Sequence, residues 1–175
     1  MKNENIFIAV LVIGLAYIAC KRKANNNTYT ISRVIENWKD TLETGSPYDM
    51  AQLYSPNAVL LGTFSEQLEI GTDEIAKYFK SFLDYNPKCT LTEIEVKNEG
   101  SSIAVANGYY EFNLEGSVHY KSQSTVPKKQ GGRDMVKARF TYVLKKNLFD
   151  KEWKIITHHS SKTFIYYTHS SKNTY

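Results

Sequence analysis

The stretch MVKARFTYVLKKNLFDKEWKIITHHSS, residues 135–161, decides the fold. It holds two apolar runs separated by the turn signals at 146–151, a pattern typical of two strands joined by a turn. Two further runs precede it, CTLTEIEV at 89–96 and SSIAVANGYYEF at 101–112. Together the four runs predict an antiparallel meander in the second half of the chain.

Helical patterns dominate the first half. Apolar residues recur at helical spacing over 31–42, Ser46 and Pro47 suit the start of a short second helix, and a third helix is predicted from 72 to 83. The run NAVLLGTF, between the second and third helices, is interpreted as a buried strand. The 175 residues can form one core. The expected fold class is α+β, with a curved antiparallel sheet wrapped around a long N-terminal helix.

Residues 1–23 read as a unit of their own. The run IFIAVLVIGLAYIAC, residues 6–20, carries no charge and ends at the basic residues 21–23. As a helix it reaches roughly 22 Å, which is short for a membrane span. With snorkelling flanks it is still expected to act as a single-pass membrane anchor. The domain that follows is then expected on the cytoplasmic side. The alternative is a secreted or lipid-anchored protein, after cleavage of a signal or acylation of Cys20. Residues 24–30, ANNNTYT, are interpreted as a polar linker.

Composition narrows the function classes. The formal net charge of +4 is mild and the basic residues are spread along the chain, so no nucleic-acid partner is expected. Cys20 and Cys89 form neither a metal-binding nor a redox spacing, and we expect no metal and no cofactor. The polar loop at 115–134 contains QGGR, which neither follows a buried strand nor opens a helix, so a mobile hairpin extension is favoured over a phosphate-binding loop.

Four segments resemble a known family. They are TGSPYDMAQLYSPNAVLLGTFS at 44–65, IAKYFKSFL at 75–83, ARFTYVLKK at 138–146 and WKIITHHSS at 153–161. In this order they resemble the association domain of calcium/calmodulin-dependent protein kinase II and its stand-alone relatives, within the NTF2-like, SnoaL-like superfamily. The resemblance covers residues 31–162 and leaves 163–175 as a C-terminal tail. It implies a cone-shaped domain with a pocket between sheet and helix, and self-association into dimers or larger rings.

The resemblance also points to site residues. The association domain of the kinase has a cluster of arginines at the bottom of its pocket. Arg139 is the counterpart of one of them, whereas two other arginine positions fall on Tyr109 and Ser160. The resemblance, with this partial cluster, implies a cone pocket for a small acidic or apolar ligand. The alternative role for Arg139 is a structural ion pair with Glu111, because a buried guanidinium needs a partner.

The adjacent histidines at 158 and 159 cannot both line one pocket, because successive strand residues face opposite sides. His158, on the face of Ser160, is the candidate for the pocket and the one credible general base. Trp38 and Tyr54 are candidate pocket walls, with membership of the core as the alternative.

Two functions from different classes follow. The first is a membrane-tethered association module that has no kinase activity, since the chain lacks the Gly-rich, catalytic-loop and DFG motifs of a kinase. The second is a SnoaL-like isomerase, hydrolase or cyclase that uses His158 as its base. A third hypothesis is an adaptor whose basic loop at 128–133 meets anionic lipid.

Overall fold

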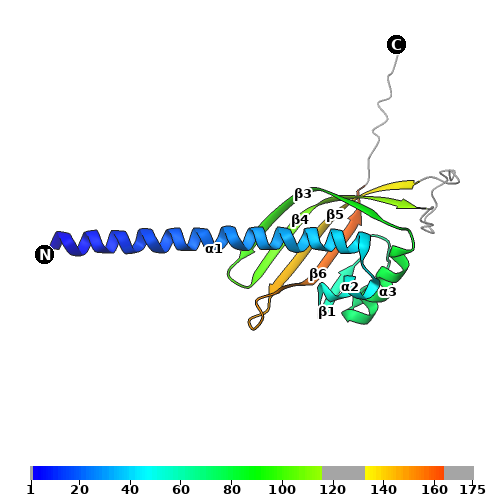
Figure 1. Ribbon diagram of the computed structural model, residues 1–175, viewed down its shortest axis with the longest axis horizontal. Helices are drawn as coiled ribbons and strands as arrows, with labels where there is room; N and C mark the ends of the chain where they lie inside the picture. The colour runs from blue at the N-terminus through cyan, green and yellow to red at the C-terminus, as the bar shows by residue number, and fades with distance from the viewer. Residues whose placement is uncertain (1, 116–132, 164–175) are drawn as a thin grey trace, which may run out of the picture.

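The computed structural model describes residues 2–115 and 133–163 (Figure 1). Most of the loop at 115–134 and nearly all of the C-terminal tail lie outside this part of the chain. So do residues 128–132 of the basic segment in the lipid hypothesis. The described elements are α1 (Lys2–Thr44), α2 (Pro47–Gln52), β1 (Tyr54–Leu61), β2 (Glu69–Ile70), α3 (Gly71–Leu83), β3 (Lys88–Glu99), β4 (Ile103–Glu115), β5 (Arg133–Lys146) and β6 (Trp153–Lys162).

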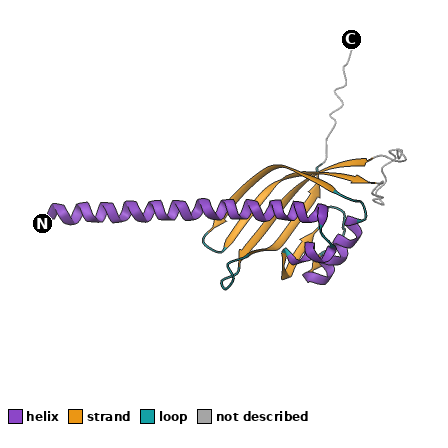
Figure 2. Cartoon of the chain, in the orientation of Figure 1, coloured by secondary structure: helices purple, strands orange, loops and turns teal. Residues whose placement is uncertain are grey.

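The strands form one curved, open sheet in the order β2-β1-β6-β5-β4-β3. The predicted meander is present, because β3 to β6 pair with their neighbours in antiparallel fashion. The sheet as a whole is mixed, since β1 pairs with β6 in parallel and with β2 antiparallel. The expectation of a purely antiparallel sheet is therefore wrong, because the last strand, β6, lies beside the first strand, β1, and parallel to it. Figure 2 shows the sheet curving around the C-terminal half of α1.

The core fills the space between α1 and the concave face of the sheet. From α1 it receives Ile31, Ile35, Trp38 and Leu42, which lie on the face that the helical spacing predicts. Alternate residues of β4 and β5 meet them from the other side, because a strand points every second side chain to the same face. The second helix starts as predicted, since Ser46, the residue before Pro47, forms a capping box with Asp49 in the first turn.

The N-terminal half of α1 differs from its prediction. Residues 24–30 continue the helix and do not form a separate tether. The polar side chains there have a structural use: Asn27 is buried, and the Asn98 amide of β3 donates a hydrogen bond to Thr28 Oγ1 at 2.7 Å. Contact with the sheet therefore begins before residue 31.

Residues 6–20, predicted as a membrane anchor, are the first half of this same helix, which extends beyond the sheet in Figure 1. Within residues 2–115 and 133–163, no helix meets the requirements of length and apolar character for crossing a membrane. The separate anchor helix that the sequence predicted is thus not found. Ile13 and Leu15 of this segment are exposed.

Candidate functional site

The pleat of the sheet divides the predicted site residues between two faces. Trp38 of α1, Tyr54 of β1 and His158 of β6 are buried on the concave, inner face, together with Ser160. Tyr109 of β4 and Arg139 of β5 are exposed on the outer face. The structure therefore brings four of the six predicted residues together and separates them from the other two by the thickness of the sheet.

A β-bulge explains how His158 comes to face inward. Ile155 of β6 pairs with Leu144, but Thr157 pairs with Val143, so two steps on β6 match one step on β5. The extra residue, Ile156, resets the alternation, and both Ile155 and His158 are buried. His159 then shares the outer face with Thr141, its partner on β5.

Hydrogen bonds link the inner residues into one cluster. The Trp38 indole N–H donates to the Tyr54 hydroxyl at 2.9 Å, and this hydroxyl lies 2.8 Å from Nδ1 of His158. On the other side of the ring, Nε2 of His158 lies 3.4 Å from the hydroxyl of Tyr110. Tyr110 in turn donates to Ser160 Oγ.

Thr63, in the loop after β1, ends this row of contacts. Its hydroxyl hydrogen-bonds with that of Ser160, and its side chain is only partly buried. Tyr110 and Thr63 are absent from the predicted set. Tyr110 had a signal, because only one of Tyr109 and Tyr110 can point inward. Thr63 belongs to the run 57–64 that was interpreted as a buried strand, but it lies just beyond the end of β1.

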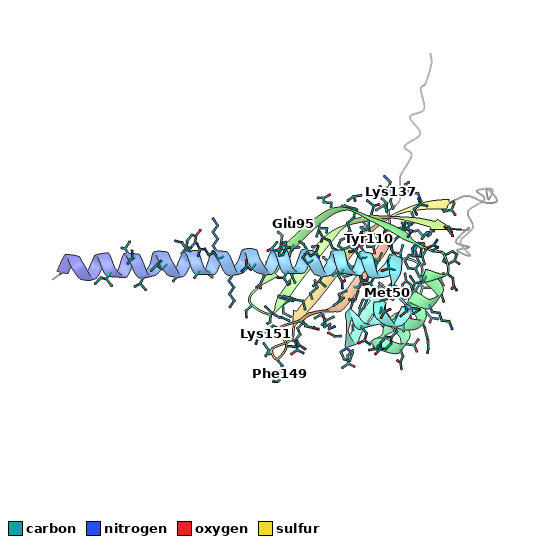
Figure 3. The ribbon with its side chains drawn as sticks, viewed as in Figure 1. Met50, Glu95, Tyr110, Lys137, Phe149 and Lys151 are labelled. Atoms are coloured by element: carbon teal, nitrogen blue, oxygen red, sulfur yellow. The ribbon has the colours of Figure 1, made fainter. Side chains whose placement is uncertain are left out.

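Aromatic rings surround the imidazole and exclude water from it. Tyr142 stacks on His158 with ring centroids 4.1 Å apart, and Trp38 meets it edge-on at 5.6 Å. Trp38 also stacks on Tyr110 at 5.9 Å, so the helix and the sheet are locked around the cluster. Figure 3 shows Tyr110 close to α1, where these rings meet.

Burial sets the protonation states of the cluster. Desolvation lowers the pKa of His158 from 6.5 to about 3, with a smaller contribution from the charge of His159. Desolvation also raises the pKa of the phenols Tyr54, Tyr110 and Tyr142. All four groups are therefore uncharged at neutral pH and can donate and accept hydrogen bonds. An imidazole with so low a pKa is a weak general base.

The inner face of β6 leads from this cluster to the rim of the cone. Lys162 follows Ser160 on that face, and its ammonium lies 5.0 Å from the centroid of the Phe64 ring. Phe64 packs on Phe82 at 5.2 Å, and Phe82 packs on Phe112 at the same distance. Partial burial lowers the pKa of Lys162.

A separate hollow of about 290 Å³ lies on the outer face. It is lined by Asn107, Gly108, Tyr109, Arg139, Phe140, Thr141, His159 and Ser161. Arg139 Nε donates to Ser161 Oγ at 3.0 Å. The pair of Arg139 with Glu111 that the sequence allowed is not formed, because Glu111 lies opposite Lys137 and pairs with it at 2.8 Å.

No cluster of three or more His, Cys, Asp or Glu side chains able to hold a metal ion occurs among the described residues.

A curved sheet folded over one helix, with a polar cluster inside, defines a cone of the NTF2-like class. The chain belongs to the SnoaL-like domain family, whose profile matches residues 31–167. No curated protein matches it.

Solved structures give the same fold. A Xanthomonas campestris structure assigned to the calcium/calmodulin-dependent protein kinase II association domain is 33% identical, with a TM-score of 0.64, covering 76% of this chain and 85% of that one. A structure from Novosphingobium aromaticivorans assigned as a scytalone dehydratase is 12% identical, with a TM-score of 0.66, covering 82% and 89%. A ketosteroid isomerase-like protein from Erwinia carotovora is 14% identical, with a TM-score of 0.60, covering 78% and 96%.

Proposed function

We propose that this chain is a self-association module of the calcium/calmodulin-dependent protein kinase II association-domain type, without kinase activity, which forms a homodimer or a larger ring through the outer face of its sheet. The observation that carries the proposal is the 33% identity to the Xanthomonas campestris structure over 85% of that chain. The buried, uncharged His158 agrees with it, because a weak base fully enclosed by aromatic rings suits a packed core.

The outer face has the mixed character of an association surface. Tyr109 is 47% exposed there, beside the hollow that also contains Arg139 and His159. Tyrosine and arginine are the residue types enriched at protein interfaces, where an aromatic ring supplies buried area and a guanidinium supplies directed hydrogen bonds. A stable dimer would need about 800 Å² of this face from each copy.

Sedimentation velocity and native mass spectrometry of the full chain test the proposal. A dimer or closed ring is expected, and Tyr109→Glu should shift it toward monomer because the new carboxylate would be buried. Phe149→Glu is the matched control: Phe149 is 95% exposed in the β5–β6 turn, away from the strand positions that form the hollow. A monomeric wild-type chain at micromolar concentration would disprove self-association.

The second candidate is an isomerase, hydrolase or cyclase of the SnoaL-like kind, with His158 as its base. The row of buried hydrogen bonds from Tyr54 through His158 to Ser160 favours it, because such a row can hold a substrate oxygen and move a proton. The low pKa of His158 restricts the base to substrates with an already acidic proton.

Deuterium incorporation into a panel of cyclic ketones in D₂O, followed by NMR, tests this second function. Exchange accelerated by the full chain and lost in His158→Ala would support it. Exchange that survives in His158→Ala would remove His158 as the base.

A further inference from the structure

A row of three residues on the outer face holds two opposite charges with a tyrosine between them. Glu93 of β3 pairs in register with Tyr109 of β4, and Tyr109 pairs with Arg139 of β5. Residues paired in this way point to the same face of the sheet. Since neighbouring strands lie about 4.8 Å apart, the backbone positions of the two charged residues are about 5 Å to either side of the tyrosine.

Both charges are available to a partner. Glu93 and Arg139 are exposed, and among the residues that the structure describes neither takes part in an ion pair. Arg139 donates from Nε to Ser161, which leaves the two terminal nitrogens of the guanidinium as donors. By contrast, Lys137 and Glu111 on the same face neutralise each other at 2.8 Å. The row therefore presents one cation and one anion to whatever covers it.

The order of this row is self-complementary under a two-fold rotation. In a dimer with two-fold symmetry, if one residue of the first copy meets a second residue of the other copy, the reverse contact also forms. Two sheets that pack face to face lie about 10 Å apart with their strands within about 30° of each other. A two-fold axis between the sheets that runs along β4 places Tyr109 opposite its own copy and exchanges β3 with β5. Arg139 of each copy then meets Glu93 of the other.

The geometry tolerates the inclination of the two sheets. One strand away from the axis, an angle of about 30° displaces facing residues along the strand by only about 2–3 Å, which long side chains can bridge. The hollow of about 290 Å³ beside Tyr109 and Arg139 gives the incoming carboxylate room to reach the guanidinium.

Charge selects this axis over one that runs across the strands. A perpendicular axis through Tyr109 would place β5 on β5 and β3 on β3, so that Arg139 meets Arg139 and Glu93 meets Glu93, and like charges in contact cost affinity. The axis along β4 avoids this. It also brings Glu95 of the second copy over Thr141, because Glu95, Asn107 and Thr141 form the next row. A second carboxylate then lies near each guanidinium.

We propose that the homodimer has its two-fold axis along β4, with Tyr109 packed on its own copy and two reciprocal ion pairs between Arg139 and Glu93. A guanidinium can hold a carboxylate through two parallel hydrogen bonds, which adds directional specificity to the attraction. The inference rests on the proposed self-association through the outer face, and it names the axis of that dimer and the residues that select a second copy as the partner.

Reversal of the two charges, singly and together, tests the pairing. Arg139→Glu makes each reciprocal pair two carboxylates and Glu93→Arg makes it two guanidinium groups, so each single variant should raise the dimer dissociation constant at least about tenfold. Glu93→Arg together with Arg139→Glu exchanges the charges and should restore the constant to within about threefold of the wild type. Lys80→Glu, at an exposed position of α3, changes the net charge as Arg139→Glu does and should leave the constant unchanged.

Sedimentation velocity of the full chain over a range of concentrations, at low and at high salt, measures these constants. Salt should weaken the wild-type dimer and strengthen the association of each single variant, because screening removes attraction in the first case and repulsion in the second. A folding defect in a variant would not produce this change of sign. Recovery in the double variant gives a second safeguard, since it carries both substitutions.

Two kinds of failure are distinguishable. If the single variants dimerise as tightly as the wild type, or if the double variant is no tighter than the single ones, the pairing is overturned and self-association stands. A wild-type chain that remains monomeric refutes self-association itself, and the pairing with it.

Discussion

The burial of a neutral histidine makes a quantitative prediction about stability and pH. His158 has a pKa of about 3 in the folded chain and about 6.5 when unfolded. Below pH 6.5 the unfolded state therefore binds a proton that the folded state refuses, and folding stability falls as the pH falls. With about 1.4 kcal/mol per pKa unit, the loss is about 2 kcal/mol at pH 5 and about 4 kcal/mol at pH 3.

Urea denaturation of the full chain at pH 5.0 to 7.5, at one protein concentration, measures this loss. His158→Gln removes the titrating ring, so its free energy of unfolding should lack the component of about 1.4 kcal/mol per pH unit below pH 6. The variant is also less stable at every pH because it loses the stacking on Tyr142, but only the difference in slope is used. Carboxylates contribute equally to both proteins and cancel.

His159→Gln provides the matched control, since it removes the exposed imidazole one residue further on and leaves the buried one in place. Its slope should follow the wild type. If wild type and His158→Gln lose stability in parallel between pH 6.5 and 5, then His158 is accessible to protons in the folded chain. The enclosed hydrogen-bond row would then be refuted.

Two other predictions concern the sheet and the thiols. Gly108→Ala should lower the free energy of unfolding by about 3 kcal/mol or more, since the new Cβ would lie 2.1 Å from the carbonyl oxygen of Glu93 at the β3 bulge. Thermal unfolding measures this loss. A Tm equal to that of the wild type would contradict the close approach. In iodoacetamide labelling of the native chain, exposed Cys20 should react and buried Cys89 should not. The reason is that desolvation raises the pKa of the Cys89 thiol to about 12. Equal labelling rates for the two thiols would show that the α1–β3 contact opens readily.

Patterns with a constant period predicted most of the fold. The helical spacing of Ile31, Ile35, Trp38 and Leu42 placed one face of α1 in the core, and all four are buried. The meander followed from four apolar runs separated by turns. The parallel pairing of β1 with β6 was not predictable in this way, because the two strands are about a hundred residues apart in sequence and only tertiary packing brings them together.

The candidate site was predicted in part, and the error has a specific cause. Two-residue alternation was applied separately to each strand, and it correctly kept His158 and His159 apart. It could not relate the faces of β5 and β6, because the pairing of Tyr142 with His158 is set by tertiary structure. Arg139 was assigned to the pocket of His158 through the resemblance to the kinase association domain, although it faces the opposite side with Thr141.

The unbroken course of α1 has a mechanical consequence. Ile18 is exposed, whereas Asn27, nine residues later, is already buried against the sheet, so about 14 Å of uninterrupted helix joins the projecting half to the cone. Because a helix resists torsion, the direction of each projecting side chain around the helix axis is fixed relative to the sheet. It advances by about 100° per residue. Inserting two residues near position 24 would turn the whole projecting half by about 200° and point it away from its original heading. Any partner that binds the projecting half is therefore held in one fixed orientation relative to the cone.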